Sequence, residues 1–374
     1  MKVANKFEAE FSPTNIRQIK PLLHDLFAPK AWIYWADFLI SWCVAGASLT
    51  VAALAWGGAG GTGVALVVAA LACYRCAIFS HELTHRPGTS LRGFRIVWNV
   101  LFGIPACLPS FTYYMHRDHH HPDHYGTRQD GEYLTLAGRK WAIVGYLAQS
   151  FIIPALAVFR FFVLTPLAWL VPAVRQWVQQ RASSMIIDPD YSRPAPTPAE
   201  WRIWQLQEIA CFVWWLALSA AFWQGLIPWA WLGGAYMVAV LAVFLNAIRT
   251  LGAHGYANPR VSVSMEAQLL DSLTYPYHPW LASLWAPVGL RYHALHHLLP
   301  SLPYHALPAA HHRLMQTLPA NSTYRQTIRL GLWCALNQLW HGEVAHLTTG
   351  GSELSTSPTT DRAPLQFPAQ QPLG

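Results

Sequence analysis

Two apolar stretches near the start of the chain decide its fold: FLISWCVAGASLTVAALAW (residues 38–56) and VALVVAALACYRCAIFS (residues 64–80). A glycine-rich segment, residues 57–63, joins them. Each stretch approaches the roughly 20 residues that cross a bilayer as a helix. The only charged side chain in them, Arg75, lies near the end of the second, where a long side chain reaches the headgroups. The sequence therefore predicts a transmembrane hairpin.

A second pair of apolar stretches, residues 209–223 and 229–248, predicts a second hairpin. Hydrophobic residues make up 53% of the chain and charged residues only 11%, less than half the charged share of an ordinary soluble protein. This composition excludes a soluble globular class. The net charge of +7 is spread over the segments between the apolar stretches, which favours lipid headgroups over nucleic acid as the partner.

The distribution of positive charge predicts the orientation in the membrane. The connections 57–63 and 224–228 contain no Lys or Arg, whereas residues 81–140 and the chain after residue 248 contain several. The positive-inside rule therefore places both termini in the cytoplasm. The apolar segment 141–174 must then cross twice or not at all. Because Arg160 lies at its middle among three prolines, we predict a kinked, partly inserted segment and four spans, with six as the alternative.

The chain divides into three regions. Residues 1–37 are a polar arm that ends in an interfacial stretch and is predicted to lie on the cytoplasmic side. Residues 38–346 contain the apolar hairpins and form one membrane domain. Residues 347–374 are rich in Gly, Ser, Thr, Pro and Gln, which predicts a disordered tail. The predicted fold class is an all-α integral membrane protein.

Eight of the histidines fall into three clusters just beyond the apolar stretches, on the predicted cytoplasmic side. The clusters are His81-x-x-x-His85, His116-x-x-His119-His120 and His293-x-x-His296-His297. On a helix, spacings of three and four place the imidazoles on one face. Eight nitrogen ligands exceed what one ion uses, so two metals are expected, although imidazole suits iron, zinc, copper and nickel alike. We predict a cytoplasmic helical cap that holds these clusters.

This pattern resembles the membrane fatty-acid desaturase superfamily, which also contains lipid hydroxylases, alkane hydroxylases and carotenoid ketolases. The likeness covers roughly residues 20–320, and the stretch WAPVGLRYHALHHLLP (residues 285–300) is similar to bacterial members. The resemblance implies a bacterial inner-membrane location and a di-iron centre that activates O₂. It also implies an external electron donor, a ferredoxin or a b-type cytochrome. The substrate would be a long-chain lipid or fatty-acyl group. Fatty-acyl desaturation is the favoured activity, with lipid hydroxylation or carotenoid ketolation as alternatives.

The resemblance also bears on which histidines bind metal. Family members commonly add a ligand before the third cluster, and His254 is the best candidate. The second cluster is ambiguous, because His116, His120 and His121 also fit the alkane-hydroxylase spacing. We prefer His119 over His121, since the third cluster has the other spacing and no Glu precedes His254. The predicted metal ligands are His81, His85, His116, His119, His120, His254, His293, His296 and His297.

Charged residues near the clusters are candidates for supporting roles. A metal-bound imidazole usually donates its other N–H to a carboxylate or carbonyl. The acidic candidates are Glu82, Asp118, Asp123, Asp130 and Asp271. Of these, Asp123 and Asp130 are expected to be solvated loop residues. The arginines Arg86, Arg92 and Arg249 are candidates to contact the polar end of a substrate.

Two alternatives belong to other classes of protein. His81-Glu82-x-x-His85 matches the His-Glu-x-x-His motif of zinc proteases, in which Glu82 would act as general base. That alternative leaves six clustered histidines without a role. A haem-binding electron carrier would use paired histidines as axial ligands, but those histidines should lie within the spans rather than beyond them.

Overall fold

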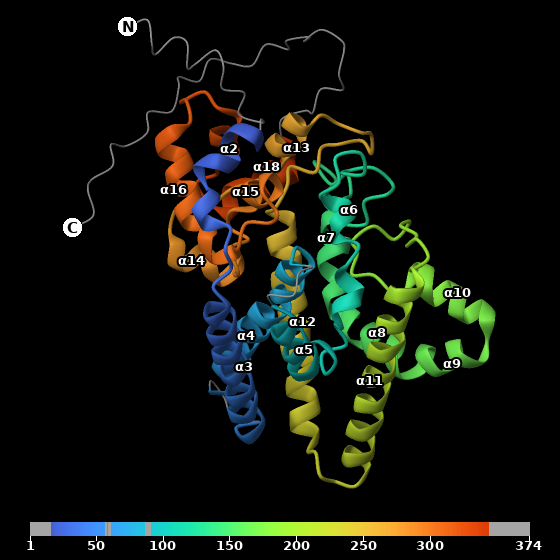
Figure 1. Ribbon diagram of the computed structural model, residues 1–374. Helices are drawn as coiled ribbons and strands as arrows, with labels where there is room; N and C mark the ends of the chain where they lie inside the picture. The colour runs from blue at the N-terminus through green and yellow to red at the C-terminus, as the bar shows by residue number, and fades with distance from the viewer. Residues whose placement is uncertain (1–15, 57, 59–60, 87–90, 344–374) are drawn as a thin grey trace, which may run out of the picture.

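A computed structural model describes residues 16–56, 58, 61–86 and 91–343 of the chain. These residues form helices and loops and contain no β-strand, only isolated β-bridges. Figure 1 shows long helices running side by side in the lower part of the molecule and short helices gathered above them. The predicted all-α membrane class is confirmed. The predicted disordered tail and residues 1–15 of the polar arm lie outside the described residues.

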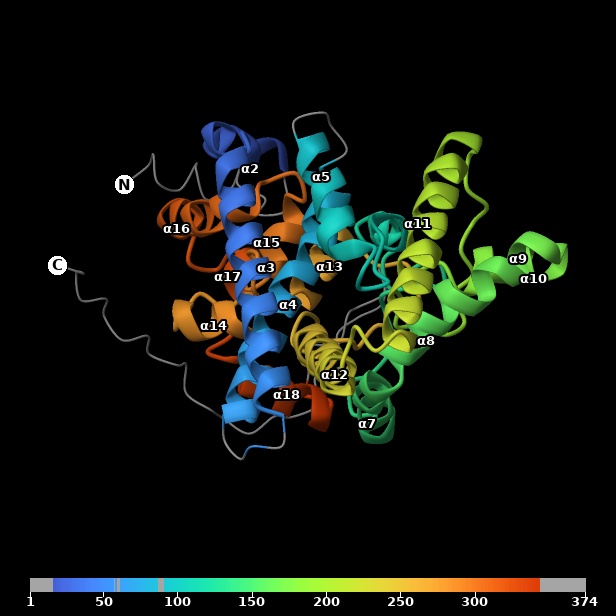
Figure 2. The same ribbon diagram turned by 90° about the horizontal axis from the view of Figure 1, so that it is seen from below.

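Four long helices form the two predicted hairpins. They are α3 (Ala31–Leu54), α4 (Gly61–Thr84), α11 (Pro198–Trp223) and α12 (Trp229–Leu251). Each is long and apolar enough to cross a membrane. The first hairpin packs α3 along α4, and α12 packs against both. Figure 2 shows this grouping end-on, with α11 standing apart from α3 and α4.

Two of these helices begin earlier than the sequence predicts. Helix α3 begins at Ala31, inside the predicted interfacial stretch, and carries Asp37 in its interior. Arg75 of α4 donates two hydrogen bonds to the Asp37 carboxylate, over 2.5 and 2.6 Å, so the charge is paired and the helix continues through it. Helix α11 begins with a capping box in which the Thr197 and Glu200 side chains each bond the other's backbone N–H.

A fifth apolar helix, Ile153–Leu170, is also long enough to cross a membrane. It consists of α8 (Ile153–Phe159), η6 (Arg160–Leu164) and α9 (Thr165–Leu170). Figures 1 and 2 show that it runs across the direction of α11 rather than along it. Arg160 is buried and donates to Glu208 of α11 over 2.5 Å, and Arg175 donates to the same carboxylate over 3.0 Å. This ion pair network holds the kinked segment against α11.

Shorter helices complete the fold. The connecting region contains α5 (Arg92–Trp98), η3 (Asn99–Gly103), η4 (Ser110–Tyr113), α6 (His116–His119), α7 (Lys140–Ala148), η5 (Gln149–Phe151) and α10 (Pro172–Arg181). The cap contains α2 (Ile16–Leu22), η1 (His24–Leu26), α13 (Met265–Asp271), α14 (Pro279–Trp285), α15 (His293–Leu298), η7 (Tyr304–Ala306), α16 (Leu307–Thr317), α17 (Thr323–Gln326) and α18 (Leu332–His341). Figure 1 places the cap at the end of the long helices opposite their hairpin turns.

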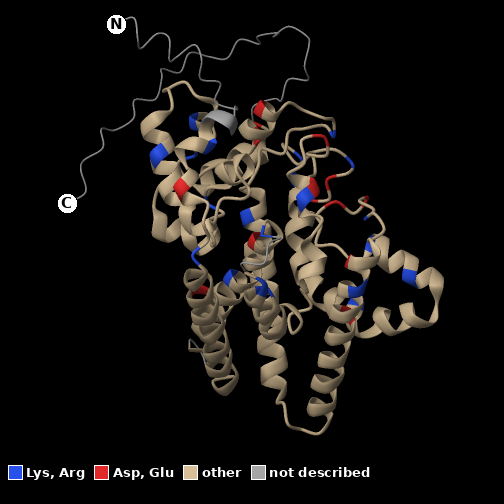
Figure 3. Cartoon of the chain, viewed as in Figure 1, with Lys and Arg blue, Asp and Glu red and all other residues tan. Residues whose placement is uncertain are grey.

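The two ends of the long helices differ in charge. Figure 3 shows Lys, Arg, Asp and Glu on the cap and on the upper ends of α3, α4, α11 and α12, while the lower ends carry none. All histidine clusters therefore lie at the charged end of the molecule.

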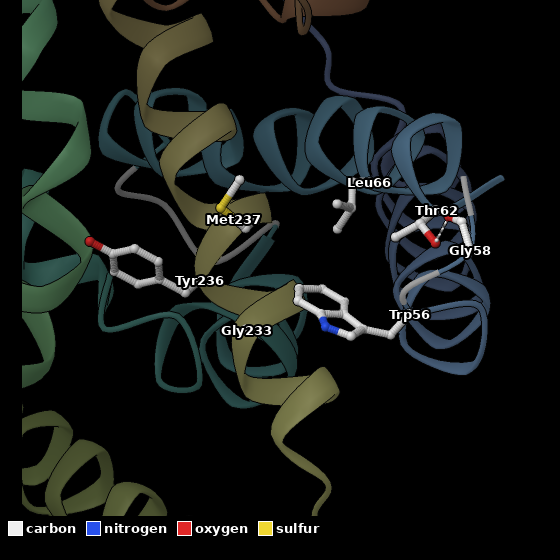
Figure 4. Close-up of a pocket in the computed structure, with 7 residues that line it drawn as sticks. All are labelled: Trp56, Gly58, Thr62, Leu66, Gly233, Tyr236 and Met237. Atoms are coloured by element: carbon white, nitrogen blue, oxygen red, sulfur yellow. Dashed lines mark hydrogen bonds between the residues drawn. The ribbon is translucent and has the colours of Figure 1, made fainter. Parts of the chain in front are cut away.

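The uncharged end contains an apolar cavity of about 410 Å³ between the α3–α4 turn and α12. It is lined by Trp56, Gly58, Thr62, Leu66, Gly233, Tyr236 and Met237 (Figure 4). A Cβ atom on Gly233 would lie 3.2 Å from the Trp56 ring, so glycine allows the close approach of α12. The cavity adjoins the first turns of α4, whereas His81 lies in the last turn. It is therefore separate from the histidine clusters.

Candidate metal centre

The nine predicted histidines come from four places in the fold. His81 lies in the last turn of α4 and His85 just beyond it. The second cluster forms α6 and its C-cap, and the third forms most of α15. His254 follows α12. The structure brings all nine together in two groups, within each of which the ligating atoms lie no more than 4.8 Å apart: His81, His85, His116, His120 and His296, and His119, His254, His293 and His297.

The five-histidine group joins all three clusters. Most of its ring pairs are edge to face or tilted, and the His81 centroid lies 4.4 Å from those of both His116 and His296. The Nε2 atoms of His120 and His116 are 3.0 Å apart, and those of His296 and His85 are 3.2 Å apart. Nitrogen atoms from helices far apart in the sequence therefore converge on one point.

The four-histidine group combines rings from α6 and α15 with His254. The Nε2 atom of His254 lies 3.0 Å from that of His119 and 2.9 Å from that of His293. The Nε2 atoms of His297 and His293 are 3.1 Å apart. His254 is thus at the centre of this group rather than at its edge.

The spacing of these nitrogens fits metal ions. Imidazole nitrogens bind zinc at about 2.0–2.1 Å, and neighbouring ligands of an octahedral ion with such bonds are about 3 Å apart. The closest pairs in both groups have this separation. His81 Nε2 is buried and has no hydrogen-bond partner in the described structure. Both groups therefore have the donor set and spacing of a metal site.

Carboxylates orient two of the rings. Asp130, which is fully buried, lies 2.8 Å from His119 Nδ1, and Glu132 lies 2.7 Å from His116 Nδ1. Asp130 also accepts backbone N–H bonds from Gly126 and Glu132, over 2.9 Å each. These bonds fold the loop after α6 back over the histidines. An Nδ1–H donated to a carboxylate leaves Nε2 free to face a metal ion.

His254 is held by contacts from the end of α13, from Leu273 just beyond it and from Tyr125. Gly255 N donates to Asp271 O over 2.8 Å, and Leu273 N donates to Ala253 O over 2.9 Å. The Tyr125 hydroxyl lies 2.9 Å from His254 Nδ1 and donates to the Asp271 carboxylate over 2.6 Å. This relay fixes the ring with Nε2 toward the other histidines.

Burial sets the protonation of the groups. It lowers the pKa of most of the histidines well below the usual value, and neighbouring rings lower it further, which keeps the imidazoles neutral, as metal ligation requires: His85, His116, His120, His254, His293, His296 and His297. For His119, burial acts in the same direction, but the Asp130 carboxylate outweighs it and raises the pKa. Burial also raises the pKa of Glu132 to about 7 and that of Asp271 to about 6.

Several residues near the clusters lie elsewhere. The His121 side chain is 49% exposed and faces Asp123, which is 85% exposed, so the structure brings His119 rather than His121 to the histidines. Asp118 bonds His124, outside both groups. The expectation that Asp130 is solvated is wrong, because its carboxylate both caps the loop and bonds His119.

The Glu82 carboxylate has three other partners. It accepts from the Tyr34 hydroxyl, from Arg86 Nε over 3.1 Å and from Tyr304 N over 3.4 Å, and it is buried. None of these partners is a histidine. The zinc-protease alternative needs Glu82 as a base beside the metal, and this carboxylate is already engaged elsewhere.

Sequence reasoning missed two supporting residues. Glu132 and Tyr125 both contact histidine Nδ1 atoms. Glu132 follows Asp130 by two positions in the loop after α6, and two carboxylates at that spacing beside three histidines were an available signal. No local pattern indicated Tyr125, because its partners Asp271 and His254 are distant in the sequence.

Comparisons with known proteins identify the family of the chain. The fatty acid desaturase family model matches residues 60–329. A ceramide hydroxylase from Caulobacter vibrioides (strain NA1000 / CB15N) is 41% identical over 327 residues, which cover 87% of this chain and 92% of the relative. No solved structure matches the chain significantly. The predicted family and the oxidoreductase class are confirmed: the chain belongs to the fatty acid desaturase family.

Proposed function

We propose that the chain is an O₂-dependent di-iron hydroxylase of ceramide or a closely related long-chain acyl lipid. The observation that carries this proposal is the 41% identity to a ceramide hydroxylase over nearly the whole of both chains. The sequence alone favoured fatty-acyl desaturation over hydroxylation. The relative supports the hydroxylase alternative instead, while the family match is compatible with either activity.

We further propose that the five-histidine and four-histidine groups each hold one iron ion. Two iron ions bound there would activate O₂ and supply the oxidising power to break an unactivated C–H bond. Hydroxylation converts the C–H bond to C–OH, consumes O₂, two electrons and two protons, and releases one water. The buried rings exclude bulk water, and Asp130, Glu132 and the Tyr125–Asp271 pair keep the imidazoles oriented.

The orientation in the membrane and the source of electrons belong to the same proposal. We propose that the histidine end faces the cytoplasm of a bacterial inner membrane and receives electrons from a ferredoxin or b-type cytochrome. The concentration of Lys and Arg at that end supports this (Figure 3). A reporter that is active only in the periplasm, fused after Leu226 in the α11–α12 turn, should be active. An inactive reporter would show that the histidine end faces the periplasm instead.

The activity is tested by expressing the chain in a host that contains ceramide but no lipid hydroxylase. Lipid mass spectrometry under ¹⁸O₂ should show ceramide with one added labelled oxygen. A product that has lost two hydrogens without gaining oxygen would instead establish desaturation. An unchanged ceramide pool together with a modified fatty-acyl lipid would show that the substrate is that fatty-acyl lipid and not ceramide.

The matched control for this experiment is His254→Ala, which removes the central ring of the four-histidine group. The variant should yield no labelled product at equal expression. Labelled product from this variant would mean that the host carries out the reaction.

A further inference from the structure

Helix α14 presents apolar side chains to the outside of the cap. Its residues Trp280, Leu281 and Leu284 are 90%, 63% and 53% exposed. Their spacing places them on one side of the helix. The segment 276–290 around them contains no Asp, Glu, Lys or Arg. Because the rest of the cap carries charged side chains (Figure 3), this apolar patch marks an interaction surface.

The fold holds α14 against the membrane helices. The Tyr74 hydroxyl of α4 donates to Trp285 O at the end of α14 over 2.9 Å. Helix α14 also packs against α12. Figure 1 shows α14 at the lower edge of the cap, the edge nearest the long helices. The exposed side of α14 is therefore continuous with the surface that the long helices present to lipid.

The start of α18 adds a second apolar patch beside α12. Trp333 is 81% exposed, and Leu330 just before the helix is also exposed. Leu332 between them packs on Gly252, where a Cβ atom would lie only 2.5 Å from Leu332 Cδ1. Gly252 directly follows the last residue of α12. Trp333 therefore lies close to the level at which this apolar helix ends.

The two patches belong to one structural unit. Tyr275 and Ala335 of α18 share a small hydrophobic core, and Trp285 of α14 packs against it. The Tyr275 and Trp285 rings meet edge to face, with centroids 4.8 Å apart. Figure 2, seen from the uncharged end, shows α14 and α18 beside α3, α4 and α12. Both patches therefore adjoin the same group of long helices.

The most exposed tryptophans of the chain fall into two sets. Trp223 and Trp229 flank the α11–α12 turn at the uncharged end, and the others lie at the charged end: Trp32, Trp141, Trp280 and Trp333. From Trp32 to the end of α3 at Leu54 the helix rises about 33 Å, close to the roughly 30 Å of bilayer hydrocarbon. Tryptophan is enriched at both membrane–water interfaces. Trp280 and Trp333 therefore fit the interface at the histidine end.

We propose that α14 and the first turn of α18 insert into the headgroup region of the leaflet on the histidine side. The partner is the lipid of the membrane that the long helices cross, because both patches adjoin those helices. Residues 286–292 connect α14 directly to α15. This insertion therefore fixes the height of the third histidine cluster above the bilayer. The inference does not depend on the reaction that the histidines carry out.

The test is photocrosslinking of the full-length protein in vesicles of phosphatidylcholine and phosphatidylglycerol. The photoreactive residue p-benzoylphenylalanine replaces Trp280 in one variant and Trp333 in another. Because both side chains are exposed, the replacements should not disturb folding, and an unchanged bound-metal content checks this. On irradiation both variants should form lipid adducts, and mass spectrometry should place the adducts near the glycerol of the lipid.

Two positions serve as matched controls. Val213, in the middle of α11, is exposed on a helix long enough to cross the membrane, and the same photoreactive residue there should form adducts further along the acyl chains. Gln316 is exposed on α16, at the outer edge of the cap (Figure 1). The photoreactive residue at that position should form no lipid adduct.

Two outcomes would overturn the inference. A crosslink from position 280 or 333 to a second copy of the chain, seen as a band of twice the mass, would show that the patch is a protein interface. If neither position forms lipid adducts while position 213 does, α14 and α18 face water and the cap stands clear of the membrane.

Discussion

The two histidine groups differ in which parts of the fold supply their ligands. The five-histidine group reaches into the membrane helices through His81 of α4 and combines all three sequence clusters. The four-histidine group combines rings from α6 and α15 with His254, which belongs to none of the three clusters. One group has more rings, and the other has two rings that are oriented by bonds to or through carboxylates.

The support differs in detail. In the four-histidine group, Asp130 holds His119, and the Tyr125–Asp271 pair holds His254. Among the described residues of the five-histidine group, only His116 has a carboxylate partner, Glu132. Each group also has one buried Nδ1 atom without a hydrogen bond, that of His120 and that of His293. A site can therefore be defined either by the number of its ligands or by the bonds that orient them. Removing one ligand or one orienting bond should therefore affect the two groups unequally.

The largest expected effect is that of His254→Ala. Because His254 contacts both His119 and His293 through Nε2, its loss removes the centre of the four-histidine group. We expect bound iron to fall from about two ions to about one per chain and lipid oxidation to stop. Elemental analysis of the purified protein measures the first, and lipid mass spectrometry the second. His305→Ala is the control, since His305 only accepts a bond from Lys30 N. Loss of both ions would show that the groups do not bind independently.

The next effect concerns the ambiguous second cluster. His119→Ala should remove iron from the four-histidine group, whereas His121→Ala should spare it, because the half-exposed His121 ring faces Asp123 and not the histidines. The two substitutions remove the same side chain two positions apart, so each is the control for the other. If elemental analysis shows that His121→Ala loses iron and His119→Ala retains it, the second cluster has the alkane-hydroxylase spacing.

Much of the fold could be predicted from the sequence, because hydropathy reports directly on membrane helices. The two helix pairs, α3 with α4 and α11 with α12, follow from it. The starts of α3 at Ala31 and of α11 at Pro198 could not be predicted from hydropathy. In α3 the reason is Asp37, whose charge marks the end of the apolar stretch unless its partner Arg75 is known. The path of residues 153–170 likewise depends on the Arg160–Glu208 contact, which no local pattern reports.

The candidate site, like the fold, could be predicted from the sequence only in part. The spacings of three and four residues place His293, His296 and His297 on one face of α15, and this could be predicted from the sequence pattern alone. The division of nine histidines into five and four cannot be read from spacing, because His119 and His120 are neighbours in sequence and belong to different groups. Asp130 was misjudged because its burial arises from loop bonds to Gly126 and Glu132, which exist only once the loop has folded.

The smallest expected effects compare the two carboxylates. Asp130→Asn removes the charge that orients His119, one of only four rings, and should weaken metal binding by that group about 10–100-fold. Glu132→Gln acts on His116, one of five rings, and Glu132 has its pKa raised to about 7 by burial, so less negative charge is lost near neutral pH. We expect an effect of about tenfold or less, at the lower end of that range. Metal-competition titrations measure both variants, with the exposed Asp123→Asn as a control that should not differ from the unsubstituted protein. If Glu132→Gln proves the more damaging, the five-histidine group depends on orientation as strongly as the four-histidine group, and the contrast between them fails.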